Sequence, residues 1–300
     1  MSNKKIVTKS YALRDFKIVG LVLIIYALFV LYIPLGLKWL FVLEGRSTNT
    51  LFICSFICLI LGTLLPFSFL MIYCKQKLSD FTSNPSIETK EKIINFIVFF
   101  AISICAVYFN TMIGGLINVE GRLISDIGVV FNSEYIKNYL YLFTFVIVSP
   151  ILEEYAFRGV LLNCLGRYGK YFAILASSIV YALAHSFFTD AIPSFIMGVI
   201  LSKMAFRYKS IRPTIFIHVI FNLSLCLLSL IPEDYVFYSA VVIAIILIVA
   251  LILVLKKKYK IIGVNKSSSN NKVTLMFVTT YTVIIALVLF ILYSIIILFI

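Results

Sequence analysis

Long apolar runs dominate this chain of 300 residues and decide which solvent it can fold in. A bilayer core about 30 Å thick is crossed by roughly 20 helical residues. Nine runs approach or exceed that length, at residues 18–37, 51–74, 93–117, 139–165, 171–188, 192–206, 214–231, 235–255 and 273–300. Because backbone polar groups in lipid must be satisfied within the segment, each run is predicted to be a helix. The expected fold is an all-α, polytopic membrane helical bundle with nine or so transmembrane helices.

The composition excludes a soluble fold. Hydrophobic residues make up 62% of the chain and charged residues 13%, whereas a soluble domain is about 45–50% apolar and about 25% charged. The first run exceeds the roughly 7–15 apolar residues of a signal peptide and no cleavage pattern follows it, so we expect it to be retained. All six cysteines lie in or beside apolar runs without a CxxC pair, and we interpret them as small buried hydrophobes.

The positions of lysine and arginine predict the orientation of the bundle. With the N-terminus in the cytoplasm, 21 of the 26 basic residues fall on the cytoplasmic side, 4 on the other side and Arg158 within a run. This asymmetry follows the positive-inside rule. The net charge of +13 is therefore interpreted as a topology signal and an attraction to anionic lipid. We expect a multi-pass protein of the plasma membrane, with the lipid bilayer as a partner and no nucleic-acid partner.

Three charged residues interrupt the run at 139–165. Glu153, Glu154 and Arg158 lie in the segment SPILEEYAFRG, and each charge near the middle of a bilayer costs about 2.5–3.5 kcal/mol on insertion scales. Glu154 and Arg158 are four residues apart, which is the spacing for an ion pair on one helical face. Glu153 lies about 100° round the helix and is expected to be unpaired.

Pro150 precedes the two carboxylates in the same run. Its ring nitrogen cannot make the helical hydrogen bond to the Val146 carbonyl, which predicts a kink and a cavity just before Glu153. A purely structural alternative remains open, in which the Glu154–Arg158 pair locks helix packing and Glu153 reaches the membrane interface.

The two histidines of the chain both fall in apolar runs. His185 ends the segment YALAH, and His218 begins HVIFN, so that Asn222 lies one turn further along the same helical face. Either histidine alone could be a hydrogen-bonded core residue. Together with the carboxylates, however, they provide a base for water, donors for an oxyanion and an acid for a leaving amine. These are the groups that hydrolysis of an amide requires.

The three motifs resemble a known family of membrane enzymes. EEYAFRG at 153–159, YALAH at 181–185 and HVIFN at 218–222 are similar, in this order, to the EExxxR, FxxxH and HxxxN motifs of the CPBP intramembrane proteases. That family includes CAAX-type prenyl-protein endopeptidases and the Abi proteins of bacteriocin immunity. Tyr181 stands where Phe is usual. The resemblance implies a catalytic four-helix core at 139–231, between a three-helix membrane region at 1–138 and a two-helix region at 232–300.

The resemblance also implies a role for each polar residue. Glu153 with His185 would activate water, His218 with Asn222 would stabilise the oxyanion, and Glu154 with Arg158 would hold Glu153 in place. Counting about 1.5 Å per residue from the cytoplasmic ends puts His218 about 9 Å deep, Glu153 about 18 Å and His185 about 21 Å. The three side chains can meet only if helices are tilted or broken.

The predicted function is an intramembrane endopeptidase that cuts a membrane-associated peptide or protein without a cofactor. Glu153, His185 and His218 also match the His₂Glu ligand set of catalytic zinc, but no HExxH helix is present. Zinc is therefore kept as an alternative to metal-free catalysis. A proton-coupled transporter and a non-catalytic scaffold are the rival functions. The high Ile, Lys and Asn content indicates an AT-rich bacterial genome, so bacteriocin-related or signalling peptide precursors are expected substrates rather than prenylated proteins.

Overall fold

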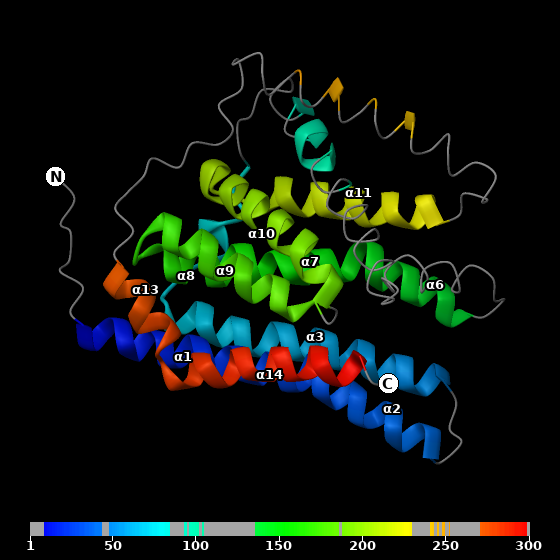
Figure 1. Ribbon diagram of the computed structural model, residues 1–300, viewed down its shortest axis with the longest axis horizontal. Helices are drawn as coiled ribbons and strands as arrows, with labels where there is room; N and C mark the ends of the chain where they lie inside the picture. The colour runs from blue at the N-terminus through cyan, green and yellow to red at the C-terminus, as the bar shows by residue number, and fades with distance from the viewer. Residues whose placement is uncertain are drawn as a thin grey trace.

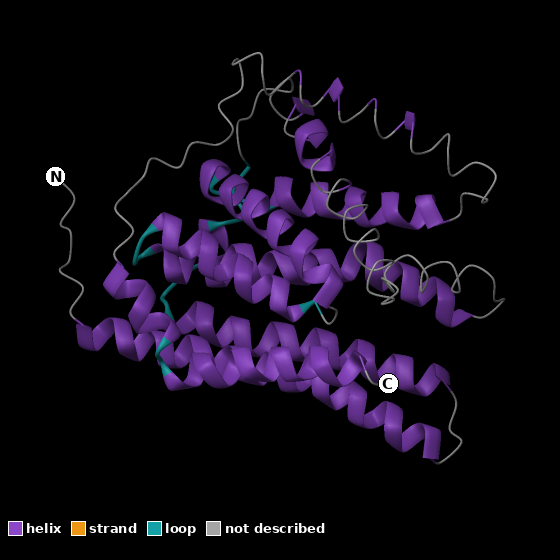
Figure 2. Ribbon diagram, in the orientation of Figure 1, coloured by secondary structure: helices purple, strands orange, loops and turns teal. Residues whose placement is uncertain are grey.

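The computed structural model confirms an all-α membrane helical bundle. It describes residues 9–43, 48–84, 136–185, 188–229 and 271–298, together with short stretches and single positions within 93–104 and 241–252. The described residues form helices joined by short loops and contain no strand (Figure 2). Most of the predicted spans at 93–117 and 235–255 lie outside these residues.

Two long composite helices carry π-helical segments, in which backbone hydrogen bonds join residues five apart. The first consists of α1 (Lys9–Ala27), the π-helical η1 (Leu28–Tyr32) and α2 (Ile33–Leu43). The second consists of α6 (Ile136–Phe143), the π-helical η3 (Thr144–Val148), α7 (Ser149–Glu153), the π-helical η4 (Glu154–Leu161) and α8 (Leu162–Gly166). The remaining helices are α3 (Thr48–Tyr73), η2 (Leu78–Asp80), α9 (Lys170–Ala184), α10 (Phe188–Tyr208), α11 (Arg212–Ser229), α13 (Asn271–Val278) and α14 (Tyr281–Leu298).

Three helices of the described residues are long and apolar enough to cross a membrane, at Ser10–Phe41, Thr50–Tyr73 and Tyr139–Gly166. The predicted run at 273–300 is not one straight helix, because α13 and α14 meet at an angle of 65°. At this bend the hydroxyls of Thr279 and Thr280 donate to the carbonyls of Leu275 and Met276, each at 2.7 Å. Side-chain donors thus satisfy carbonyls near the break. The count of about nine spans and the cytoplasmic N-terminus stay predictions.

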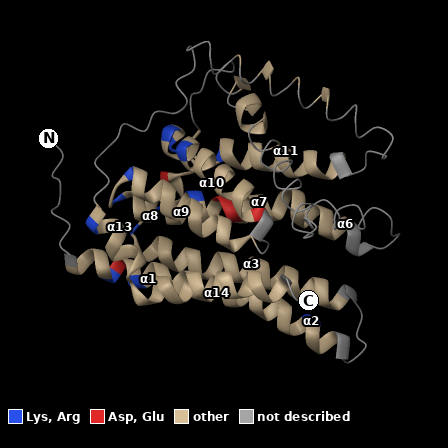
Figure 3. Ribbon diagram, viewed as in Figure 1, with Lys and Arg blue, Asp and Glu red and all other residues tan. Residues whose placement is uncertain are grey.

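The helices form layers that run along the long axis of the molecule (Figure 1). Helices α1, α3 and α14 lie in one layer, α7, α8 and α9 lie above it, and α10 and α11 lie beyond them. In the first layer, α1 packs against α14, so helices from the N-terminal and C-terminal parts of the chain lie side by side. The charged residues of α7 and η4 lie in the middle layer, where Glu154 and Arg158 are buried. Figure 3 shows these acidic residues in the middle of the bundle, while described lysines and arginines gather mainly at one end.

Asp15 ties three elements together near the basic end of the bundle. Its carboxylate accepts hydrogen bonds from the Tyr73 hydroxyl at 2.9 Å and from the Tyr168 hydroxyl at 2.6 Å. Burial, followed by the bond to Asp15, raises the pKa of the Tyr168 phenol above its ordinary value. Asp15 therefore links α1 to the end of α3 and to the turn between α8 and α9.

One disulfide corrects the interpretation of the cysteines. Cys74, just after α3, and Cys164, in α8, are bridged in the structure. They are 90 residues apart in the sequence, so local spacing did not indicate the pair. Cys54 and Cys58 are unbridged and partly buried in α3, as small hydrophobes would be.

Gly20 allows α1 and α14 to approach closely. A Cβ atom at this position would lie 2.4 Å from the Thr282 hydroxyl oxygen and 2.5 Å from the Thr282 backbone carbon. The Thr282 hydroxyl also donates to the Lys17 carbonyl at 3.0 Å. A small residue facing a hydroxyl is a common way for membrane helices to pack without a hydrophobic driving force between them.

Replacing Gly20 tests this contact. We expect Gly20→Ala to lower the midpoint of thermal unfolding in detergent, because overpacking a close contact costs about 1–3 kcal/mol. Gly36→Ala is the matched control, since no atom lies within 4 Å of a Cβ built there and alanine favours the helix. If both variants unfold at the wild-type midpoint, the close approach of α1 and α14 is wrong.

Candidate active site

The ion pair predicted from the four-residue spacing is present. Arg158 Nη1 lies 3.0 Å from Glu154 Oε1, and the two side chains are 1% and 0% exposed. Arg158 also lies over the ring of Tyr181, with its guanidinium carbon 3.9 Å from the ring centroid. The Arg158 guanidinium therefore meets Glu154 and the Tyr181 ring inside the protein, where water does not screen these interactions.

Glu153 is less isolated than the sequence predicted. Ser149, one turn earlier, donates its hydroxyl hydrogen to Glu153 Oε1 at 2.5 Å. The other carboxylate oxygen, Oε2, is buried and has no hydrogen bond among the described residues. Glu153 is therefore anchored through one oxygen and leaves the other for chemistry. Ser149 was missed, although its spacing of four residues from Glu153 was visible in the sequence.

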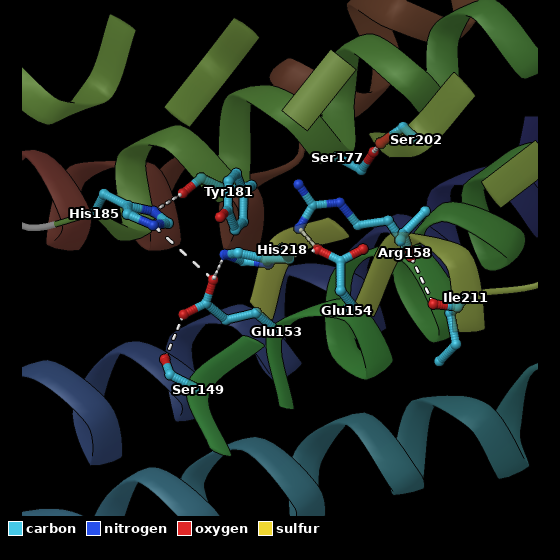
Figure 4. A network of polar contacts seen from close by, with 11 residues as sticks. Ser149, Glu153, Glu154, Arg158, Ser177, Tyr181, His185, Ser202, Ile211 and His218 are labelled. Atoms are coloured by element: carbon cyan, nitrogen blue, oxygen red, sulfur yellow. Dashed lines mark hydrogen bonds and ion pairs between the residues drawn. The ribbon is translucent and has the colours of Figure 1, made fainter. Parts of the chain in front are cut away.

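Both histidines converge on this second oxygen. The Nε2 atom of His218 lies 3.8 Å from Glu153 Oε2, and that of His185 lies 4.0 Å from the same oxygen (Figure 4). The depths counted from the sequence differ by up to about 12 Å if every helix is straight. The real helices are interrupted by π-helical segments, and α9 ends just before His185, whose backbone is extended. These breaks bring the three side chains together.

The hydrogen bonds of the imidazole rings decide which nitrogen faces the site. His185 Nδ1 lies 2.9 Å from the Tyr181 carbonyl, which can only accept. His218 Nδ1 lies 3.1 Å from Glu154 Oε1, which only accepts when ionised. We therefore assign the proton of each neutral ring to Nδ1. Each Nε2 then carries a lone pair, so a water molecule beside Glu153 would meet proton acceptors.

Asn222 has a different partner from the one its predicted role requires. Its amide nitrogen donates to the carbonyl of Phe145 at 2.8 Å. The π-helical register explains why this carbonyl is available, since the residue five positions later is Pro150, which has no N–H. The sequence had placed the freed carbonyl at Val146, four positions before the proline. Asn222 thus replaces a missing backbone hydrogen bond and fastens α11 to η3.

A cavity of about 310 Å³ opens beside Glu153. Its wall within the motif-bearing helices includes Ser149, Glu153 and His185. Another part of its wall comes from the flanking helices, with Tyr26, Val30, Leu31, Leu59 and Tyr293. Asp190, at the start of α10, also lines it. None of these flanking residues was predicted, because each belongs to an ordinary apolar run and only packing brings it to the site.

The zinc alternative requires Glu153, His185 and His218 to meet one ion. Among the residues that the structure describes, no group of three or more His, Cys, Asp or Glu side chains is placed to hold a metal ion. Glu153 Oε2 lies 3.8 Å from His218 Nε2 and 4.0 Å from His185 Nε2, somewhat more than the about 3.4 Å that separates two ligands of one tetrahedral zinc ion. We therefore derive no step of the chemistry through a metal.

The buried ion pair gives a prediction for stability. Removing one partner should destabilise the protein more than removing both, because an uncompensated buried charge costs roughly 3–5 kcal/mol. We expect Arg158→Met to unfold at a lower temperature in detergent than the double variant Glu154→Leu/Arg158→Met. An Arg158→Met protein that unfolds no earlier than the double variant would show that the pair is uncoupled.

Comparison with protein-family models supports the resemblance. Residues 135–224 match the model described as type II CAAX prenyl endopeptidase Rce1-like. This segment contains all six predicted site residues and confirms the similarity to the CPBP intramembrane proteases. Searches of curated proteins and of solved structures found no match.

Proposed function

From the premise that residues 135–224 form a type II CAAX prenyl endopeptidase Rce1-like domain, we propose that the chain is an intramembrane endopeptidase that uses water activated by Glu153. The family supports CAAX-type protease activity in general. The observation that carries the finer proposal is the convergence of Glu153 Oε2 with the Nε2 atoms of His185 and His218, at 4.0 and 3.8 Å. A purely structural ion-pair network would not require a carboxylate oxygen and two imidazole nitrogens to converge at one place.

The first step is the attack of water on the scissile carbonyl. Glu153 Oε2 accepts one proton of the water, and the Nε2 of His185 holds the second as a hydrogen-bond acceptor. The water oxygen bonds to the carbonyl carbon, and the carbonyl π electrons move to its oxygen. His218 enters this step as the imidazolium, with a proton taken from solvent on Nε2 in addition to the one on Nδ1. It donates a hydrogen bond to the oxyanion without giving up that proton, and Glu154 stabilises the imidazolium through Nδ1.

The second step expels the amine. The electron pair on the oxyanion re-forms the carbonyl, the carbon–nitrogen bond breaks, and the proton held by Glu153 passes to the leaving nitrogen. Ser149 holds the other oxygen of Glu153 throughout. Asn222 acts here as a positioning residue, because its bond to the Phe145 carbonyl holds the helix that carries His218.

The cavity indicates which substrates fit. Val30, Leu31 and Leu59 give it apolar surface, and Tyr26 and Tyr293 add aromatic rings. Such walls favour a bulky apolar side chain beside the scissile bond. We propose a membrane-associated peptide or protein as the substrate, in a bacterial plasma membrane, and a peptide precursor for signalling or bacteriocin immunity as its class.

Glu153→Gln tests the proposed general base. The amide is nearly isosteric but cannot take the proton of water, so we expect cleavage to fall below detection. Peptides released from membranes of cells that express the wild-type chain or the variant are compared by mass spectrometry. The peptides that appear only with the wild type identify the substrate, and its cleavage is then repeated with the purified proteins.

Two controls keep this result interpretable. The variant must insert and unfold like the wild type, and turnover of the identified peptide at the wild-type rate would contradict the assignment of Glu153. Activity is also measured with a strong chelator, together with the metal content of the purified protein. Stoichiometric zinc with chelator-sensitive, zinc-restored activity would instead establish the zinc alternative.

The flanking wall of the cavity can be tested separately from the catalytic residues. We expect Val30→Trp to lower kcat/KM for the identified peptide by roughly 10-fold or more. The larger side chain would fill part of the cavity, and a poorer fit in a hydrophobic pocket costs about 1–3 kcal/mol of transition-state binding. Leu28→Trp is the matched control, because Leu28 belongs to the same π-helical segment but is 41% exposed. Equal loss in both variants would indicate a general effect on η1 rather than on the cavity.

A further inference from the structure

The hydroxyl group of Tyr181 is buried without a partner at the edge of the candidate active site. Tyr181 is 0% exposed, and its hydroxyl oxygen makes no hydrogen bond to any described residue. An unsatisfied buried hydroxyl costs about 1–3 kcal/mol. A phenylalanine here would keep the ring and avoid this cost, so the hydroxyl needs an explanation.

The ring of Tyr181 is fixed by its neighbours. Arg158 covers one face at 3.9 Å. The ring centroids of Tyr181 and His185 are 4.4 Å apart in an edge-to-face arrangement, and those of Tyr181 and Phe157 are 5.3 Å apart. These contacts leave rotation of the O–H bond as the main freedom of the side chain. The direction of the hydroxyl is therefore set by packing.

Figure 4 shows the Tyr181 hydroxyl pointing toward Glu153 and His218. Glu153 Oε2 is itself a buried acceptor without a hydrogen bond among the described residues. A lone donor and a lone acceptor thus face each other inside the protein.

We propose that Tyr181 is a positioning residue whose hydroxyl donates a hydrogen bond to Glu153 Oε2 and aims the general base at the water. The role in catalysis rests on the proposed function, whereas the hydrogen bond between Tyr181 and Glu153 does not. Ser149 holds Oε1 from the preceding turn, and Tyr181 holds Oε2 from α9. The carboxylate is then fixed at both ends in its ionised form, which charge-assisted hydrogen bonds favour. Tyr181 keeps its proton throughout the reaction.

The contact is tested by infrared spectroscopy of the full-length protein labelled with ¹³C-glutamate. Subtracting the spectrum of Glu153→Gln isolates the carboxylate band of Glu153. We expect this band to shift in Tyr181→Phe, because the carboxylate loses a hydrogen bond. Tyr155→Phe is the matched control, since the Tyr155 hydroxyl lies 2.8 Å from Ser68 Oγ, on a different element. Its Glu153 band should stay at the wild-type position.

The outcomes separate the contact from the enzyme activity. In the wild-type background, Tyr181→Phe should lower kcat roughly 10-fold with KM unchanged, as expected for the loss of one hydrogen bond to a charged group. A Glu153 band that does not move in Tyr181→Phe overturns the proposal, even if the chain cleaves peptides. A shifted band in a chain that cleaves nothing upholds the contact and overturns the proposed function.

A second variant guards against misfolding of Tyr181→Phe. Incorporating 3-fluorotyrosine at position 181 keeps the hydroxyl and makes it a stronger donor. We expect the Glu153 band to move in the direction opposite to that in Tyr181→Phe, or away from its wild-type position if Tyr181→Phe does not fold. No movement with 3-fluorotyrosine contradicts the proposal.

Discussion

The buried pair of Glu154 and Arg158 is the interaction on which the candidate site depends. Three charges within one helix are tolerated inside an apolar bundle only if they compensate one another. Arg158 meets Glu154 at 3.0 Å and the face of Tyr181 at 3.9 Å, while the same Glu154 oxygen accepts from His218 at 3.1 Å. One ion pair therefore joins η4 to α9 and α11, the two helices that supply the histidines.

The π-helical register around Pro150 completes this arrangement. It frees the Phe145 carbonyl, and Asn222 binds that carbonyl at 2.8 Å. Since His218 lies one turn before Asn222, the same bond sets the height of its ring beside Glu153. An irregular helix inside a membrane needs a donor of this kind, because lipid cannot satisfy the exposed carbonyl. The broken helix and the polar site thus stabilise each other.

The helices outside the Rce1-like domain also contribute to the site. Tyr26 and Val30 come from the first composite helix, and Tyr293 from α14, yet all three line the cavity beside Glu153. Close packing of α1 against α14 at Gly20 positions this wall. In the proposed function, the catalytic groups belong to the segment that matches the family model, whereas part of the surface that would meet the substrate belongs to segments outside it. We therefore expect substrate preference to differ among proteins that share the domain.

The sequence by itself determined the all-α membrane fold and the Glu154–Arg158 pair, because run length, charge cost and four-residue spacing are local properties. It also singled out Glu153, His185, His218 and Asn222, since polar groups in apolar runs are expensive to keep. Only the tertiary structure decided that Glu153 is held by Ser149, that Asn222 binds a backbone carbonyl, and that Tyr26 and Tyr293 line the cavity. It also revealed the pairing of Cys74 with Cys164. These features depend on helix breaks and on contacts between distant segments, and neither the hydrophobic pattern nor residue spacing encodes how separate helices pack.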